Sequence, residues 1–140
     1  MLEKEIPNLK LCYKLKELGY PQTGNGWFWS QSPKGDIVLV YWFGLDGFYK
    51  GEKVRIENGW KIICKVPNCC EIFKFLPDSV KVNGTKHILR IRKDILKDPF
   101  DNIIYENYVL TYGTIFLCYA PNLIHLLIKT FIWLKEKKLI

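Results

Sequence analysis

The sequence predicts an α+β protein in which three helices cover a mostly antiparallel sheet, within a single domain that spans residues 1–140. Three observations predict this class. An apolar residue followed by Pro-Asn occurs three times and is typical of a helix start. Asn-Gly dipeptides, which are common in tight hairpin turns, separate several apolar segments. The segment 120–140 carries apolar residues three and four positions apart, as a buried helix does.

The three Pro-Asn pairs place a capping side chain at Asn8, Asn68 and Asn122. Asparagine at this position accepts hydrogen bonds from the otherwise unpaired amides of the first helical turn. The expected helices are Leu9–Leu18, Cys69–Leu76 and a long helix within Ala120–Ile140. The last is so broadly apolar that it must be covered on more than one side, and we expect it to be central.

Extended segments surround the Asn-Gly dipeptides and give the expected element order α-β-β-β-β-α-β-β-β-α. The strands are expected at Trp27–Ser32, Ile37–Phe43, Lys53–Glu57, Trp60–Val66, Ser79–Val82, Lys86–Lys93 and Ile103–Tyr112. The favoured hairpins turn at Asn58-Gly59 and Asn83-Gly84. The segment Gly44–Gly51 is predicted to be the most mobile loop.

The formal net charge is +7 and comes mostly from lysine. It is spread along the chain without a basic tail, so it favours solubility and weak attraction to polyanions without defining a nucleic-acid site. The charged opening does not read as a signal peptide. An apolar run at Ile115–Leu134 is interrupted by Pro121 and Lys129, which favours a buried helix over a membrane span.

The five cysteines form no CxxC pair, which favours reduced thiols in a cytosol. Cys64, Cys69 and Cys70 together with His87 or His125 are the candidate zinc ligands. Adjacent cysteines on a helix point about 100° apart, so their spacing suits a zinc site poorly. Buried thiols are therefore the favoured interpretation, and no metal or other cofactor is predicted.

Aromatic residues make up 15% of the chain and cluster at Trp27-Phe28-Trp29 and Tyr41-Trp42-Phe43. In strands, alternate side chains face opposite ways, so at least one aromatic of each trio should sit away from the core. Two interpretations stay open: cross-strand packing of the rings, or an exposed contact patch. The candidate residues for a protein-binding patch are Trp27, Trp29, Trp42, Phe48 and Tyr49.

A basic segment, Lys86–Lys93, has cations on alternate positions. Lys86, Arg90 and Arg92 share one face of the expected strand, and Glu106 on the next strand is placed to neutralise part of this charge. A solvated sheet face is the favoured interpretation. The alternative is a nucleic-acid-binding face. Its candidate residues are Lys86, Arg90, Arg92 and Lys93.

No catalytic motif is recognisable in the chain. The serines occupy no nucleophile-elbow setting, and neither histidine lies in an HExxH spacing. Most carboxylates are scattered singly, and the group around Asp94 lies close to arginines in sequence. Charge balance therefore explains this group better than acid/base catalysis does. We predict that the protein is not an enzyme.

The opening Leu15–Gln22 (LKELGYPQ), the following Trp27–Ser30 (WFWS) and the closing Leu126–Leu139 (LLIKTFIWLKEKKL) resemble small uncharacterised proteins encoded by bacteriophages and prophages. This resemblance covers about a third of the chain, at its two ends, and transfers no functional residue. It implies a bacterial cytosol as the setting. The expected function is a non-enzymatic accessory or adaptor protein that binds a host or viral macromolecule, and the alternative is a nucleic-acid-binding protein.

Overall fold

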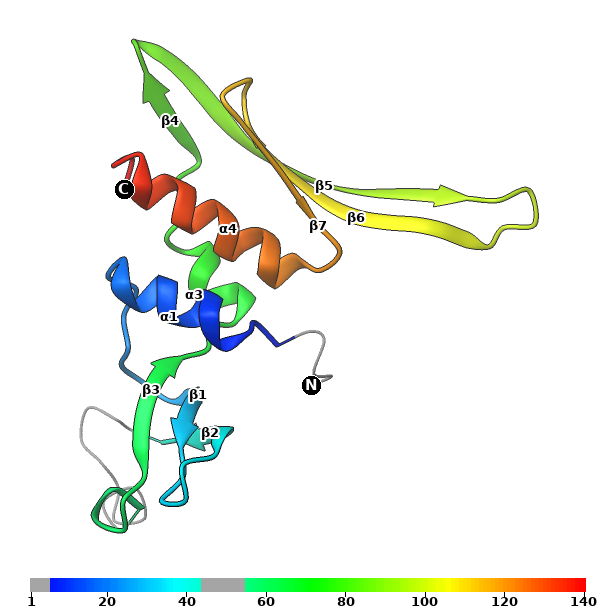
Figure 1. Ribbon diagram of the computed structural model, residues 1–140. Helices are drawn as coiled ribbons and strands as arrows, with labels where there is room; N and C mark the ends of the chain where they lie inside the picture. The colour runs from blue at the N-terminus through cyan, green and yellow to red at the C-terminus, as the bar shows by residue number, and fades with distance from the viewer. Residues whose placement is uncertain (1–5, 44–54) are drawn as a thin grey trace. The chain divides into compact units, whose positions relative to one another are not determined.

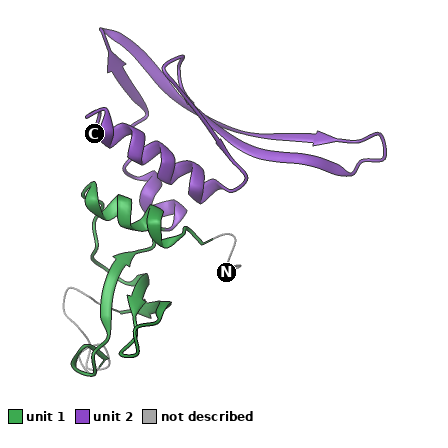
Figure 2. Ribbon diagram, viewed as in Figure 1, with its two compact units in different colours: residues 1–67 green, residues 68–140 purple. Residues whose placement is uncertain are grey.

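A computed structural model describes residues 6–43 and 55–140 of the chain. It confirms the α+β class, with two antiparallel sheets in place of the single sheet that was expected. One sheet has the strand order β2-β1-β3 and the other β4-β5-β6-β7. The chain divides into two compact units, residues 1–67 and 68–140, drawn in green and purple in Figure 2. That these units form one domain stays a prediction.

The first unit packs one helix on a three-stranded sheet. Its elements are α1 (Leu9–Glu17), β1 (Gly26–Gln31), β2 (Ile37–Trp42) and β3 (Lys61–Lys65). The strand β1 is central and pairs antiparallel with both neighbours. Cys12 of α1 and Cys64 of β3 are fully buried and form a core cluster with Val66. The cysteines of this unit therefore serve as small apolar core residues.

The second unit places a four-stranded sheet against two helices (Figure 1). Its elements are α3 (Cys69–Phe73), β4 (Ser79–Val82), β5 (Thr85–Lys97), β6 (Ile103–Tyr112), β7 (Phe116–Ala120) and α4 (Leu123–Glu136). Helix α4 contacts α3, β6 and β7. The ring of Trp133 on α4 stacks on Phe116 and Tyr112, with centroids 4.2 Å and 6.0 Å apart. We call the sheet face that carries Tyr112 the inner face and the opposite face the outer face.

Helix α4 is buried on more than one side, as its sequence predicts. Its buried positions include adjacent residues, which no single helical stripe could contain. They are Ile124, Leu126, Leu127, Ile128, Thr130, Phe131 and Leu134. The hydroxyl of Thr130 donates to the carbonyl oxygen of Leu126, 2.8 Å away, so this buried polar group is satisfied. Among the described residues, no helix combines the length and the apolar character that a membrane crossing needs.

All three predicted helix caps are confirmed. The side-chain oxygens of Asn8, Asn68 and Asn122 accept from backbone amides three residues further on, at 2.8 to 3.0 Å. These bonds fix where each helix begins, because they satisfy amides that have no partner inside the helix. The ends of the helices are less well predicted, since α3 ends at Phe73 instead of Leu76.

The predicted hairpin at Asn83-Gly84 is confirmed, and the one at Asn58-Gly59 is wrong. Asn83 and Gly84 have positive φ of 52° and 79° and join β4 to β5 in a two-residue turn. Residues 55–57 are helical instead of extended. Gly59, with φ of +96°, caps this helical turn, and the Trp60 amide donates to the Arg55 carbonyl oxygen at 3.0 Å.

The predicted element order also differs from the observed one. Among the described residues, one strand fewer than expected precedes α3, because residues 55–57 are helical. One more follows it, because Phe116–Ala120 pairs with β6 as β7. Residues 53 and 54, and the loop predicted at residues 44–51, lie outside the described residues.

Candidate binding surface on the β5–β6 hairpin

The hairpin of β5 and β6 extends beyond the rest of its sheet (Figure 1). Strand β7 pairs with β6 only from Tyr108 to Tyr112, and β4 pairs only with residues 85–88 of β5. Residues 94–107 are therefore a two-stranded ribbon, which we call the arm. An isolated two-stranded ribbon is only marginally stable in water, so this part of the protein has little support of its own.

Large apolar side chains of the arm are exposed to solvent on both of its faces. Leu96 and Tyr105 lie opposite each other on the outer face, and Ile95 lies on the inner face. The exposed apolar residues of the arm are Ile95, Leu96, Phe100, Ile103, Ile104 and Tyr105. Phe100 at the tip is 84% exposed and Ile104 is 64% exposed. Exposed apolar groups concentrated in this way make the arm a candidate interaction surface.

Asp98 organises the turn that holds Phe100 at the tip. Its carboxylate accepts from the backbone amides of Phe100 and Asn102, at 2.9 Å and 2.8 Å. The backbone hydrogen bond from Asn102 lowers the pKa of Asp98, because it stabilises the ionised form. Asp101 in the same turn has φ of +67°. The turn is thus a defined structure that presents an apolar ring to solvent.

Ion pairs join charged residues at the base of the arm and along it. Lys93 forms an ion pair with Glu106 on the inner face, and their hydrogen bond raises the pKa of Lys93. Arg92 Nε lies 3.0 Å from Asp94 on the outer face. Lys97 pairs with Asp101 at 3.2 Å. Local pairing of this kind offsets the charges that lie beside the apolar groups of the arm.

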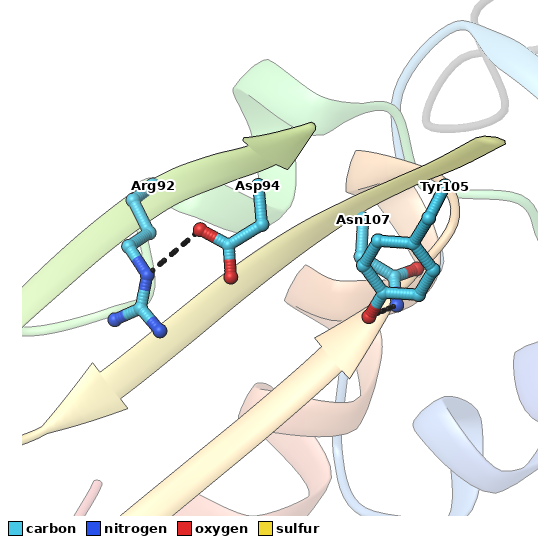
Figure 3. A network of polar contacts seen from close by, with 4 residues as sticks. All are labelled: Arg92, Asp94, Tyr105 and Asn107. Atoms are coloured by element: carbon cyan, nitrogen blue, oxygen red, sulfur yellow. Dashed lines mark hydrogen bonds and ion pairs between the residues drawn. The ribbon is translucent and has the colours of Figure 1, made fainter. Parts of the chain in front are cut away.

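Asn107 at the base of the arm is buried. Figure 3 shows its side chain beside that of Tyr105. Its side-chain amide contacts the hydroxyl of Tyr105. When the amide is oriented to satisfy both groups, its oxygen accepts from Tyr105 and its nitrogen donates to the carbonyl oxygen of Ala120 at 3.2 Å. Asn107 thus links the base of the arm to the end of β7.

An apolar pocket of about 430 Å³ lies beside the base of the arm on the inner face. Ile91 and Lys93 of β5 and Tyr108 of β6 line the sheet side. Its helix side is lined by Cys69, Cys70, Phe73, Leu123 and Leu127. The described residues of its walls are mostly apolar and form no cluster of acid, base and nucleophile, so the pocket is suited to an apolar side chain.

The structure divides the predicted aromatic patch between core and surface. Trp27 is 44% exposed and lies edge-on to Tyr41 at 5.4 Å. Trp29 is half-buried, and its indole nitrogen donates to the carbonyl oxygen of Pro7 at 3.2 Å. Phe48 and Tyr49 lie outside the described residues.

The prediction that Trp42 belongs to an exposed contact patch is wrong, because its side chain is fully buried. Strand alternation and the β1–β2 register place it on the buried face with Phe28 and Ser30. Its indole nitrogen donates to the Ser30 hydroxyl at 3.0 Å. The expectation that each trio turns one ring outward is confirmed by the exposure of Trp27 and Phe43.

The predicted basic residues divide between the two faces of β5. Lys86, Arg90 and Arg92 share the outer face, as expected. Leu117 and Tyr119 of β7 are on the same face, and Tyr119 is 60% exposed. Lys93 lies on the inner face, where Glu106 neutralises it, so it cannot act together with the other three.

The five cysteine thiols differ in their exposure to solvent. Burial raises the pKa of Cys12 to about 12 and that of Cys64 to about 11. Cys70 is exposed at the pocket. Among the residues that the structure describes, no three His, Cys, Asp or Glu side chains are grouped so that they could hold a metal ion.

Sequence analysis missed the arm as a surface. The apolar alternation of β5 and β6 is the usual signal of burial, so their sequence pattern does not separate the arm from the sheet. The unsupported ribbon follows from the observed length of β5, which has 13 residues against 4 in its partner β4. No protein-family model, curated protein or solved structure matches this chain, so its function has to be argued from these contacts.

Proposed function

We propose that this protein is a non-enzymatic accessory or adaptor protein that binds another protein through the apolar arm, residues 94–107. The resemblance to phage and prophage proteins supports a bacterial cytosol as its setting and a host or viral protein as its partner. The observation that carries the proposal is the exposure of the arm's apolar side chains together with the local pairing of the charges beside them.

The chemistry of the arm favours a protein over other partners. An exposed apolar ribbon gains free energy when a partner covers it, about 1.5 to 3 kcal/mol for each large side chain that becomes fully buried. Aromatic and branched apolar residues that fill pockets are the usual energetic centres of protein interfaces. Phe100 at the tip and Ile104 behind it are the expected anchors.

The test compares Ile104 with a matched isoleucine in the same sheet. Ile104→Ser and Phe100→Ser remove apolar contacts from the arm. Ile88→Ser makes the same change at a residue that is 50% exposed in β5, outside the arm. Partners are captured from nuclease-treated bacterial lysate with the full chain and each variant, and affinities for the purified partner are then measured.

We expect each arm variant to weaken binding by about tenfold to a hundredfold, since each removes one buried anchor. The Ile88→Ser variant should bind like the unchanged protein. Equal binding by all variants, with unchanged circular dichroism, would exclude the arm as the contact surface.

A second candidate function is nucleic-acid binding by the outer face of the sheet. It is favoured by the register, which brings Arg92, Val109 and Tyr119 side by side on three strands, with Arg90 and Lys86 on the same face. Exposed tyrosine beside arginine can stack on a base while the cations contact phosphates. The affinity would then fall steeply with salt and would be weakened by Arg90→Gln. A salt-independent or undetectable interaction at low salt would reject this candidate.

A further inference from the structure

Along the middle of β5, the edge on the β4 side pairs with no strand among the described residues. The amide of Leu89 donates to the carbonyl oxygen of Asp78 at 2.9 Å, which is the last bond on the β4 side. At the other end, the regular β5–β6 register is interrupted after Leu96. The open stretch is therefore Arg90–Leu96, and Lys93 is its midpoint. An unpaired edge of this length is a template for another strand.

The direction of the free backbone groups follows from two hydrogen bonds. Leu89 donates toward β4, whereas the carbonyl oxygen of Ile88 accepts from Gly113 on the β6 side, at 3.2 Å. In an antiparallel ladder, successive residues point their N–H and C=O groups to opposite edges. The groups on the open edge are thus those of Ile91, Lys93 and Ile95.

The open stretch is complementary to itself. If two copies pair antiparallel about a two-fold axis at Lys93, then Ile91 of each copy lies opposite Ile95 of the other, and Arg92 lies opposite Asp94. Each pair joins side chains on the same face of the sheet. The ladder uses the backbone groups of Ile91, Lys93 and Ile95, which point to the open edge, as antiparallel pairing requires. The register therefore joins two apolar pairs and two pairs of opposite charge.

The ion pairs that Arg92 and Lys93 form within the chain are compatible with these contacts. Arg92 uses only Nε toward its own Asp94, and its two terminal nitrogens point away from that carboxylate in Figure 3. Lys93 is neutralised by Glu106 and lies over the Tyr108 ring at 5.3 Å, which reduces repulsion at the axis. Ile91 lines the apolar pocket, so Ile95 of the second copy would lie at the mouth of that pocket.

We propose that the protein forms a symmetric dimer in which the Arg90–Leu96 edges of two copies pair antiparallel with Lys93 at the two-fold axis. The pairing joins the two four-stranded sheets into one continuous sheet. Phe100, Ile103 and Ile104 lie beyond the paired stretch, so each copy keeps its own tip. The dimer therefore presents two tips and would bind its protein partner twice.

Analytical ultracentrifugation of the full chain over a concentration series tests the dimer. We expect reversible dimerisation, and Arg92→Asp or Asp94→Arg alone should each raise the dissociation constant at least about tenfold, because two symmetric pairs become like-charged. The double variant, Arg92→Asp with Asp94→Arg, should recover the dimer. A chain that is monomeric at every concentration, or single variants that dimerise normally, would overturn the proposal. So would a folded double variant that stays monomeric.

A backbone variant tests the edge itself. Lys93→Pro removes an amide that points to the open edge and leaves the bonds to β6 in place, so it should abolish the dimer while circular dichroism is unchanged. Lys93→Ala keeps this amide and should stay dimeric. Dimerisation by the proline variant would overturn the proposal. Binding of the arm's partner by a monomeric variant would leave the proposed function standing, so the two ideas can fail separately.

Discussion

Replacing phenylalanine by alanine should lower the free energy of unfolding strongly at Phe131 and hardly at all at Phe100. Phe131 in α4 is 1% exposed, its ring meets Phe75 edge-on at 5.9 Å, and Lys135 lies 5.7 Å from its centroid. Phe131→Ala removes this buried ring and leaves a cavity, which costs about 3 to 5 kcal/mol of the free energy of unfolding. Phe100 is 84% exposed, so Phe100→Ala should change that free energy by less than about 0.5 kcal/mol.

Urea unfolding monitored by circular dichroism measures both values, and the slope with urea shows whether the unfolded states are comparable. The expected difference between the variants is about 3 kcal/mol, a large share of the stability of an ordinary domain. A Phe100→Ala variant as destabilised as Phe131→Ala would mean that the tip is packed in the free protein. The apolar arm could then not serve as a docking surface.

Two further predictions concern titratable groups. Burial raises the pKa of Cys12 to about 12, so this thiol should react with iodoacetamide only after unfolding. The exposed Cys70 should react first. Modification of Cys12 in the folded protein at a rate comparable to that of Cys70 would contradict the packing of α1. The pKa of Asp98 is lowered in the folded protein, because the ionised carboxylate accepts the hydrogen bonds of the tip turn. The turn should therefore be ordered above the pKa of an unfolded aspartate, about 4, and should lose this order as the pH falls through the lower pKa of the folded state. Hydrogen exchange of the Phe100 amide, corrected for its intrinsic rate, should therefore speed up below about pH 4. In Asp98→Ala, which removes the acceptor, exchange should be fast at all pH values. Unchanged protection at low pH would refute this role of Asp98.

The sequence determined the features whose cause is local. The three asparagine caps, the Asn83-Gly84 hairpin and the broad apolar surface of α4 each depend on residues within a few positions of one another. Such interactions need no distant partner, so their pattern is complete in the sequence. The alternation of Trp27 and Phe28 was predictable for the same reason, because it follows from strand geometry alone.

Only the tertiary structure decided which apolar residues find a partner. Asn58-Gly59 has the same letters as a hairpin turn, yet it ends a helical turn because residues 55–57 do not pair as a strand. Trp42 is buried and Phe100 is exposed, although both are aromatic residues in or beside apolar strands. The reason is that burial depends on whether a second layer covers a strand, and the layer that covers β6 at Tyr112 does not extend to the arm.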